Sequence, residues 1–431
     1  MRILILSTAF RPDTAIAAKR PYMFAKYLAE NGHAVTVVWS GQISKSWDKS
    51  HNKETGFTVI SYTGEIRQTK QRLTKRDIMF LPLPIINTIF KLVHTIKIPL
   101  IIYRARKNMY SHFRLIKNVI DSFEPKSFDI VFSTYGGLAN ILAGQYASRK
   151  FNCKWVLDFR DRIVQPDNQN WLWNYSFSKF ESKAYRSADI VTTVSDDLFH
   201  YSKYPQEKRR TIYNGYSSDN VLVSDFIYKT KEFSICYTGT VVSFRIFAVK
   251  YLFNIIRKMI NSRQLNYDLV RIKYVGHDGG EFAKVASEFG LQGNIVDYGY
   301  MDLNSTYKIQ MESDLFLVLS ENTKKYQGIL TGKFYEGIRC RKPILSIIYG
   351  NTPNSELYRL NEKYHYGYCY EICRAKLMED SFRSFLISMY NQKINNGKVN
   401  FELSKDLIEK FDYKNLTKEL ECIFKNLLKE K

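Results

Sequence analysis

The chain has 431 residues, enough for two domains that each bury a hydrophobic core, and its 45% hydrophobic and 25% charged residues are usual for a globular protein. The six cysteines are scattered, and the one close pair, Cys369 and Cys373, lacks the usual zinc-ligand spacing, so neither a disulfide framework nor a zinc site is predicted. Met1 is followed by RILILSTAF, an apolar run that is too short for a signal peptide and has no cleavage site. We therefore expect a cytoplasmic protein with reduced thiols.

The formal net charge of +22 is concentrated in one segment. Residues 66–120 contain twelve Lys or Arg residues and one acid, Asp77, a local balance of 12 − 1 = +11. Within this segment, residues 79–103 are apolar but are interrupted by Lys91, His94, Lys97 and three prolines, so they are too broken to span a bilayer. Apolar groups flanked by cations predict a segment that lies on an anionic membrane surface. A solvated basic face is the plainer alternative, and no nucleic-acid-binding motif accompanies the charge.

Short apolar strands alternate with helices along the chain. In the first half we predict strands at 2–7, 34–39, 57–62, 129–134, 154–159 and 189–194, with helices such as 19–30 and 138–149 between most of them. In the second half we predict strands at 233–239, 271–276, 294–299, 314–320 and 343–348, with helices at 247–261, 281–289, 305–312 and 332–339. Apolar strands joined by crossover helices indicate two parallel, doubly wound α/β sheets. We assign domains to 1–215 and 216–405, and a C-terminal helix that returns to the first domain to 406–431.

Residues 328–349, GILTGKFYEGIRCRKPILSIIY, form the most informative motif. Thr331 and Gly332 begin a predicted helix, whose free N–H groups and positive dipole end attract an anion, and Lys333 adds a full charge. Glu336 offers two acceptor oxygens that suit the paired hydroxyls of a ribose. The pattern therefore predicts a phosphate and ribose site. A capped amphipathic helix without a ligand explains the segment equally well.

Further candidates follow from the fold class, because doubly wound sheets bind ligands at the carboxyl ends of their strands. Residues at the ends of the strands at 2–7, 154–159 and 233–239, and in the segments that follow them, are therefore candidate site residues. They are Arg11 and Lys19, then Asp158, Arg160 and Asp161, and then Gly239, Thr240, Arg245 and Lys250. The second group also fits a purely structural ion-pair cluster.

The order and spacing of nine segments resemble one family of enzymes. They are RILILSTAFRPD, AKRPYMFAKYLAENGHAVTVV, FDIVFST, VLDFRD, SADIVTTVSDDL, IYNGY, ICYTGT, ESDLFLVLS and TGKFYEGIRCRKPIL. Together they are similar to GT-B fold glycosyltransferases, and most of all to retaining glycosyltransferase family 4 and its relatives in bacterial surface polysaccharide synthesis. The similarity covers almost the whole chain. It implies two Rossmann-like domains facing across a cleft, the first for the acceptor and the second for a nucleotide-sugar donor.

The resemblance also implies roles for the candidate residues. Glu336 matches the second glutamate of the family's paired-glutamate motif and would bind the donor ribose, while Thr331 and Gly332 match the turn that holds the donor phosphates. Arg245 and Lys333 would stabilise the leaving diphosphate, with Lys250 a less favoured alternative to Lys333. Asp161, held by Arg160, is our candidate for an acid near the acceptor or sugar. Gly239 and Thr240 complete the donor side, and Arg11, Lys19 and Arg160 form the acceptor side.

The resemblance further implies a hexosyl or N-acetylhexosaminyl transfer with retention, from a UDP- or GDP-linked sugar and without a metal or other cofactor. The acceptor would be a lipid-linked sugar or glycan in capsule, lipopolysaccharide or exopolysaccharide synthesis. The basic segment would hold the first domain against the inner face of the cell membrane, where such an acceptor lies.

Three positions depart from the family pattern. Gly328 stands eight residues before Glu336, where the family often has its first glutamate. Tyr135-Gly136-Gly137 replaces a segment that often begins with histidine, and residues 15–18 replace a glycine pair. These departures leave the donor and acceptor open. A nucleotide-sugar epimerase and a catalytically degenerate nucleotide-binding protein of the same fold remain as alternatives.

Overall fold

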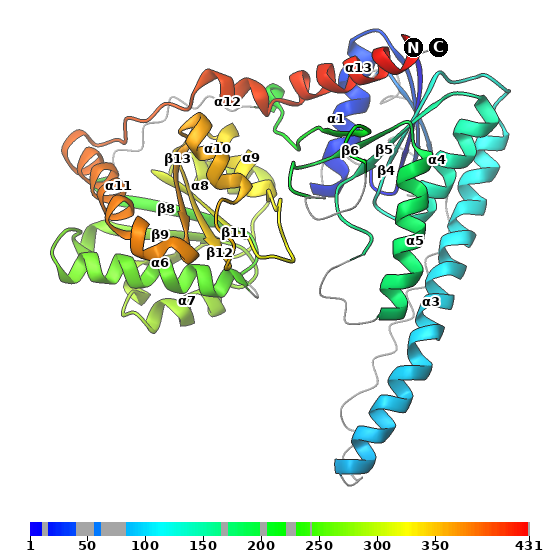
Figure 1. The fold of residues 1–431 in the computed structure, drawn as a ribbon. Coiled ribbons are helices and arrows are strands. Elements are labelled where there is room, and N and C mark those ends of the chain that lie inside the picture. The colour runs from blue at the N-terminus through cyan, green and yellow to red at the C-terminus, as the bar shows by residue number, and fades with distance from the viewer. Residues whose placement is uncertain are drawn as a thin grey trace. The chain divides into compact units, whose positions relative to one another are not determined.

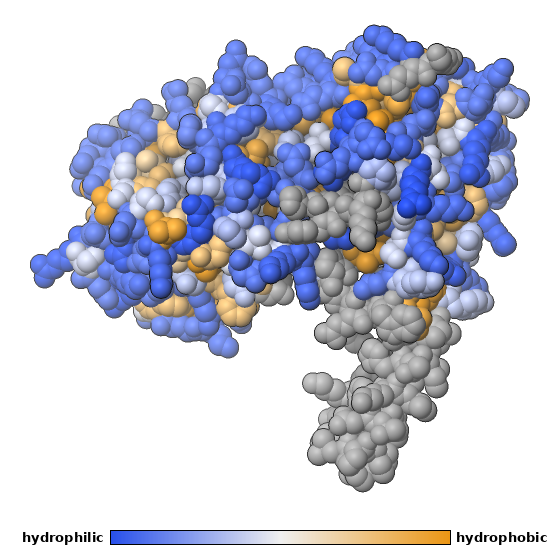
Figure 2. All heavy atoms as spheres, in the orientation of Figure 1, coloured by the Kyte–Doolittle hydropathy of each residue, from blue (hydrophilic) through white to orange (hydrophobic). Residues whose placement is uncertain are grey.

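The computed structural model describes residues 1–10, 16–39, 56–61, 83–164, 171–198, 205–220, 230–241 and 244–429. These residues form two compact α/β units (Figure 1). The first unit comprises Met1–Thr193, Tyr201–Thr211 and Glu419–Lys431, and the second comprises Val194–His200 and Ile212–Lys418. Hydrophilic side chains cover much of the visible face of each unit (Figure 2).

The first unit is built on a parallel sheet in the order β3-β2-β1-β4-β5-β6-β7. Its central strands are buried almost throughout, which is why the sequence shows near-continuous apolar runs there. The strands are β1 (Arg2–Ser7), β2 (Ala34–Trp39), β3 (Thr58–Ser61), β4 (Ile130–Thr134), β5 (Lys154–Phe159), β6 (Ile190–Thr193) and β7 (Arg209–Thr211).

Helices connect these strands. They are α1 (Ile16–Glu30), α3 (Leu83–Asp121), α4 (Leu138–Phe151) and α5 (Trp171–Ser187). The long helix α3 lies beside α4 and α5 (Figure 1). Of the predicted basic apolar segment, residues 66–82 lie outside the described residues, and the rest belongs to α3. No helix among the described residues combines the length and apolar composition needed to cross a membrane.

The second unit contains a parallel sheet in the order β10-β9-β8-β11-β12-β13. Its strands are β8 (Phe233–Thr238), β9 (Val270–Val275), β10 (Ile295–Asp297), β11 (Leu315–Glu321), β12 (Ile344–Tyr349) and β13 (Gly367–Glu371). Its helices are α6 (Phe244–Asn261), α7 (Gly279–Ser287), α8 (Leu303–Met311), α9 (Gly332–Arg339), α10 (Glu356–Tyr364), α11 (Ala375–Asn396), α12 (Lys405–Lys410) and the start of α13 (Tyr413–Lys429).

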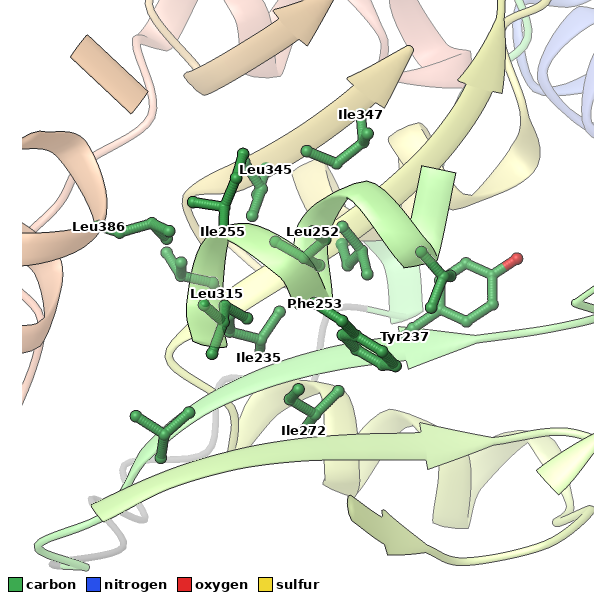
Figure 3. Close-up of a cluster of buried hydrophobic side chains, with 14 of the residues drawn as sticks. Ile235, Tyr237, Leu252, Phe253, Ile255, Ile272, Leu315, Leu345, Ile347 and Leu386 are labelled. Atoms are coloured by element: carbon green, nitrogen blue, oxygen red, sulfur yellow. The ribbon is translucent and has the colours of Figure 1, made fainter. Parts of the chain in front are cut away.

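The main core of the second unit lies between this sheet and the helices α6 and α11. Leu252, Phe253 and Ile255 of α6 point toward strand residues such as Ile235 and Leu345 (Figure 3). All of these side chains are at most 1% exposed. Burial of such aliphatic side chains fixes the strands in place, and the loops at their carboxyl ends are thereby held as well.

The end of α13 belongs to the first unit. Phe424 packs on Phe132 of β4, with ring centroids 6.0 Å apart. Asn31 Nδ2 donates a hydrogen bond of 2.8 Å to Glu421 Oε2. These contacts attach the last turns of the chain to the sheet and helices of the first unit.

The structure confirms the predicted fold class of two parallel α/β sheets. It adds two strands that the sequence pattern did not predict. Both lie at sheet edges, where β7 consists of the polar residues RRT and β13 has the sequence GYCYE. Edge strands bury less of their surface and therefore carry a weaker hydrophobic pattern.

Candidate functional site

The candidate site lies at the carboxyl end of the second sheet. The strand order reverses between β8 and β11, and such switch points form the ligand crevice of open α/β sheets. Gly239, directly after β8, has a φ of +125°, a conformation that favours glycine. Helix α9 follows β11 and carries the phosphate and ribose motif predicted from the sequence.

Glu336 is held by residues from three elements. Lys333, one turn earlier on α9, places its Nζ 2.9 Å from Oε1 and 3.0 Å from Oε2. Gln310 of α8 donates from Nε2 to Oε2 at 2.8 Å, and Thr238 Oγ1, at the end of β8, lies 3.5 Å from the same oxygen. The Glu336 side chain is 18% exposed and that of Lys333 is 24% exposed, so both groups still reach solvent. A ligand in the crevice would meet a fixed carboxylate and an ammonium together.

Gln310 and Thr238 are members of the candidate site that were not predicted from the sequence. Gln310 is fully buried and also donates to Thr238 Oγ1 at 3.1 Å, while its Oε1 accepts from Arg339 Nη2 at 3.4 Å. Thr238 could have been included because it is the last residue but one of the predicted strand 233–239. No local pattern distinguishes Gln310, whose partners are distant in the sequence.

The loop after β8 lies next to Lys333. A Cβ atom on Gly239 would lie 3.3 Å from Lys333 Cε, so the lysine side chain passes directly over this glycine. Arg245 Nη1 donates a hydrogen bond of 2.6 Å to Thr240 Oγ1. The structure therefore brings together Gly239, Thr240, Arg245 and Lys333. Lys250, the less favoured alternative to Lys333, is paired with Glu288 at 2.6 Å.

The first turn of α9 is not capped by a side chain. Thr331 is the N-cap residue, yet its hydroxyl makes no capping hydrogen bond. The Thr331 Oγ1 atom is buried, and no partner for it exists within the part of the chain that the structure describes. A buried hydroxyl without a partner is costly. The N-terminus of α9 can therefore accept an anion, with both backbone N–H groups and this hydroxyl as donors.

Neighbouring residues hold the loop after β8 in place. Tyr274 OH donates to the Gly239 carbonyl at 2.8 Å, and Asp278 Oδ2 accepts from the Val241 N–H at 2.8 Å. Beside them His277 stacks on Tyr300, with ring centroids 4.2 Å apart. These contacts fix the backbone around Gly239 before any ligand arrives.

Gly328 occupies a position where a side chain has no room. Its φ is +69°, and a Cβ atom there would lie 2.5 Å from Ser195 Oγ and 2.7 Å from the backbone nitrogen of Leu198. The departure from the family's first glutamate is therefore built into the packing of this loop.

In the first unit, Asp158 forms a buried ion pair with Arg20 of α1. Their side chains are 0% and 1% exposed, and Arg20 donates two hydrogen bonds of 3.0 and 2.7 Å to the carboxylate. Burial alone would raise the pKa of Asp158. The charge and hydrogen bonds of Arg20, together with a hydrogen bond from Thr192, instead lower this pKa below its ordinary value. The pair joins α1 to β5 and gives Asp158 a structural role.

Arg160 and Asp161, two other candidates of the first unit, lie near Tyr135. Arg160 donates from Nε to the Tyr135 carbonyl at 3.1 Å and from Nη1 to the Ala17 carbonyl. Asp161 is exposed. Burial, followed by the charges of Asp161 and Glu181, raises the pKa of Tyr135 to about 12, so this phenol stays protonated. Lys19 is partly buried on α1, and Arg11 lies outside the described residues.

Among the residues that the structure describes, no three His, Cys, Asp or Glu side chains are grouped so as to hold a metal ion.

Comparisons with known proteins show similarity to glycosyltransferases. Residues 17–220 match the model of Glycosyltransferase Family 4. No curated protein sequence matches. Among solved structures, HepE of Anabaena bound to UDP is 13% identical over 99% of this chain and 100% of that one, with a TM-score of 0.54. Sucrose-phosphate synthase of Thermosynechococcus elongatus is 11% identical over 100% of both chains, with a TM-score of 0.62.

A third similar structure is the lipopolysaccharide outer core galactosyltransferase WaaB. It is 13% identical over 99% of this chain and 100% of that one, with a TM-score of 0.54. The chain therefore has the GT-B fold, and its residues 17–220 are similar to Glycosyltransferase Family 4.

Proposed function

We propose that this protein is a glycosyltransferase that moves a sugar from a nucleotide-diphosphate sugar to an acceptor hydroxyl. The observation that carries the proposal is the arrangement of Glu336 and Lys333 at the switch point of the second sheet, beside the uncapped N-terminus of α9. The Family 4 match supports it. HepE, which shares the fold, has been solved with UDP and with UDP-glucose.

The chemistry follows from the charges. When the glycosidic bond to the diphosphate breaks, negative charge develops on the leaving phosphate and must be stabilised. Lys333, Arg245 and the first N–H groups of α9 would supply that stabilisation without a metal. Lys333 can bind Glu336 and the leaving phosphate at the same time, because an ammonium has three donors and only some of them are used by Glu336. Glu336 would accept hydrogen bonds from the ribose hydroxyls of a UDP- or GDP-linked donor.

The remaining features of the proposal concern the acceptor. We propose that a hexose or N-acetylhexosamine is transferred with retention to a lipid-linked sugar or glycan in surface polysaccharide synthesis. The galactosyltransferase WaaB, named for the lipopolysaccharide outer core, supports such a pathway. Asp161 would act near the acceptor or sugar, with Arg11, Lys19 and Arg160 on the acceptor side. The protein would work in the cytoplasm, on the inner face of the cell membrane.

The test is a panel of nucleotide sugars incubated with the purified protein and a membrane lipid extract. Release of nucleoside diphosphate and the mass of any glycosylated product are measured for the wild type, for Glu336→Ala and for a matched control, Glu362→Ala, on the exposed face of α10. We expect release with one donor that depends on the extract. Loss of the ribose contact should lower this activity at least about 10-fold in Glu336→Ala, since hydrogen bonds to a charged group contribute roughly 1.5–3 kcal/mol, and leave Glu362→Ala unchanged.

Other outcomes separate the alternatives. Conversion of the donor into another nucleotide sugar, without transfer, would indicate an epimerase. Tight nucleotide binding with no turnover of any donor would indicate a degenerate binding protein. Gly328 favours this last alternative over the epimerase, because the packing around it excludes the carboxylate that many relatives have there.

A further inference from the structure

The described part of α3 has two unlike faces. Met109, Ile116 and Ile120 are buried, with exposed fractions of 7%, 1% and 0%. Tyr103 and Tyr110 are exposed by 62% and 53%, although they are large aromatic side chains. Arg106 lies at the boundary and donates to Ser176 Oγ of α5 at 2.8 Å. The buried face attaches the helix to the first unit, and the exposed face is left for another contact.

The exposed face carries a regular stripe of aromatic and basic residues. Tyr103, Lys107, Tyr110 and Arg114 are spaced by four, three and four residues, which places them in one row along a helix. Lys107 and Arg114 are exposed like the two tyrosines. We call these four residues the α3 stripe.

No acidic residue of the helix neutralises this stripe. The sequence has no Asp or Glu between residues 83 and 120, and the first acid, Asp121, forms ion pairs with Lys117 and Lys150. The stripe therefore presents positive charge with tyrosine side chains between the cations. This combination suits the interface of an anionic bilayer, where phosphate groups meet the cations and tyrosine rings lie at headgroup depth.

The sequence of the preceding turns favours a membrane over a nucleic acid. Twelve of the 20 residues from 83 to 102 are Ile, Leu, Val or Phe, with Lys91 and Lys97 between them. Aliphatic residues contribute to insertion at a lipid interface, whereas nucleic acids are bound by cations and aromatic stacking. In the sequence, the stripe is therefore preceded by a stretch of the composition that an interfacial helix requires.

From these observations we propose that the α3 stripe binds the surface of an anionic lipid bilayer. The contact deepens the proposed function, since it would hold the first unit where a lipid-linked acceptor lies. In that respect the inference rests on the proposed function. The binding itself requires no enzymatic activity. It can therefore be tested separately from sugar transfer.

The first experiment measures sedimentation with vesicles of phosphatidylcholine and phosphatidylglycerol at physiological salt. The stripe variant is Lys107→Glu with Arg114→Glu. The matched control is Lys284→Glu with Lys398→Glu, two exposed lysines of the second unit. Each pair of changes lowers the net charge equally, 22 − 4 = +18. We expect the affinity of the stripe variant for the vesicles to fall at least about 30-fold, because two basic contacts of on the order of 1 kcal/mol each are lost. The control should bind within about threefold of the wild type, because distant charges are screened.

A second experiment locates the contact. Tyr110→Trp should show a blue shift of its fluorescence when anionic vesicles are added, whereas Leu377→Trp, at a 79% exposed position of α11, should not. Equal vesicle binding by the stripe and control variants, or no shift at Trp in position 110, would overturn the proposal. RNA binding is measured in parallel. If the stripe variant loses RNA binding and vesicle binding to the same degree, and Trp at position 110 shows no shift, the stripe binds polyanions in general and the proposal is overturned.

Donor turnover in solution distinguishes the two proposals. A stripe variant that loses vesicle binding but still binds and turns over a soluble donor supports the membrane contact and leaves the proposed function intact. Vesicle binding by the stripe in a protein that turns over no donor would support the membrane contact alone.

Discussion

At the scale of single residues, the ion pair of Glu336 and Lys333 contributes little to the stability of the fold. The two side chains remain 18% and 24% exposed, and partly exposed ion pairs contribute only about 0–1 kcal/mol to folding. Gln310, which is buried, nevertheless fixes the carboxylate at 2.8 Å. The structure thus fixes the orientation of a carboxylate that adds little to the stability of the fold, as the proposed ribose contact requires.

Gly328 gives a prediction about packing. Replacement by alanine should cost about 1–2 kcal/mol for the positive φ, and a further 1–3 kcal/mol, roughly, for the displacement of Ser195 and the backbone at Leu198. Gly397 has a similar φ of +72°, and a Cβ atom there would have no neighbour within 4 Å among the described residues, so it is the matched control. The free energy of unfolding of each variant is measured by urea titration with circular dichroism. Equal losses in Gly328→Ala and Gly397→Ala would show that Gly328 is not confined by its neighbours.

At the scale of elements, the start of α10 is joined to the segment Val194–His200. Ser355 caps the helix by accepting from the Tyr358 N–H at 3.3 Å. Glu356 then accepts hydrogen bonds from the N–H groups of Asp196 at 2.9 Å and Asp197 at 3.2 Å. Burial raises the pKa of Glu356 to about 7, although the two amide hydrogen bonds oppose it and the charges of Asp197 and Asp196 add to it. The carboxyl group therefore titrates near neutral pH.

This element gives a prediction about pH. The pKa of Glu356 is higher in the folded protein than in the unfolded chain, so the folded state holds its proton more strongly. The contribution to stability is complete below about pH 4.5 and decreases as the pH rises to about 7, by up to about 3 kcal/mol at 1.4 kcal/mol per pKa unit. In Glu356→Gln, which resembles the protonated carboxyl, this dependence should disappear. Urea titrations from pH 5 to 8 measure it, and parallel profiles for the two proteins would contradict the assignment.

How well each element could be predicted depends on the range of its interactions. Buried central strands such as β1, β4 and β11 impose a local apolar pattern, and they were found within about two residues of their bounds. The helix α9 was predicted with its observed bounds, 332–339. The edge strands β7 and β13 lack such a pattern and were missed.

The candidate site divides in the same way. Glu336, Lys333 and Gly239 could be chosen as candidates because each stands in a short motif or at the end of a predicted strand. Gln310 reaches Glu336 over 26 residues of sequence, and Arg20 reaches Asp158 over 138. Such contacts depend on how helices pack on the sheet, and a single sequence carries no local mark of them.

At the scale of the whole molecule, each unit has a parallel sheet with one switch point, and each sheet is supported by its own core. This plan is shared with proteins that are only 11–13% identical. Sequence identity can fall this low because the plan depends on where apolar strands and crossover helices occur, and many residues satisfy that pattern. The candidate site residues of the second unit are few, and they lie on the loop after β8 and on α9, at the carboxyl end of the sheet.

The measurement that tests the central claim most directly is the binding of a nucleoside diphosphate and its 2′-deoxy analogue, by calorimetry, to the wild type and to Glu336→Ala. If Glu336 accepts hydrogen bonds from the ribose, the wild type should bind the deoxy analogue about 10- to 100-fold more weakly, since a hydrogen bond to a charged group contributes about 1.5–3 kcal/mol. Glu336→Ala should bind both nucleotides alike. Equal discrimination against the deoxy analogue by both proteins would contradict the account.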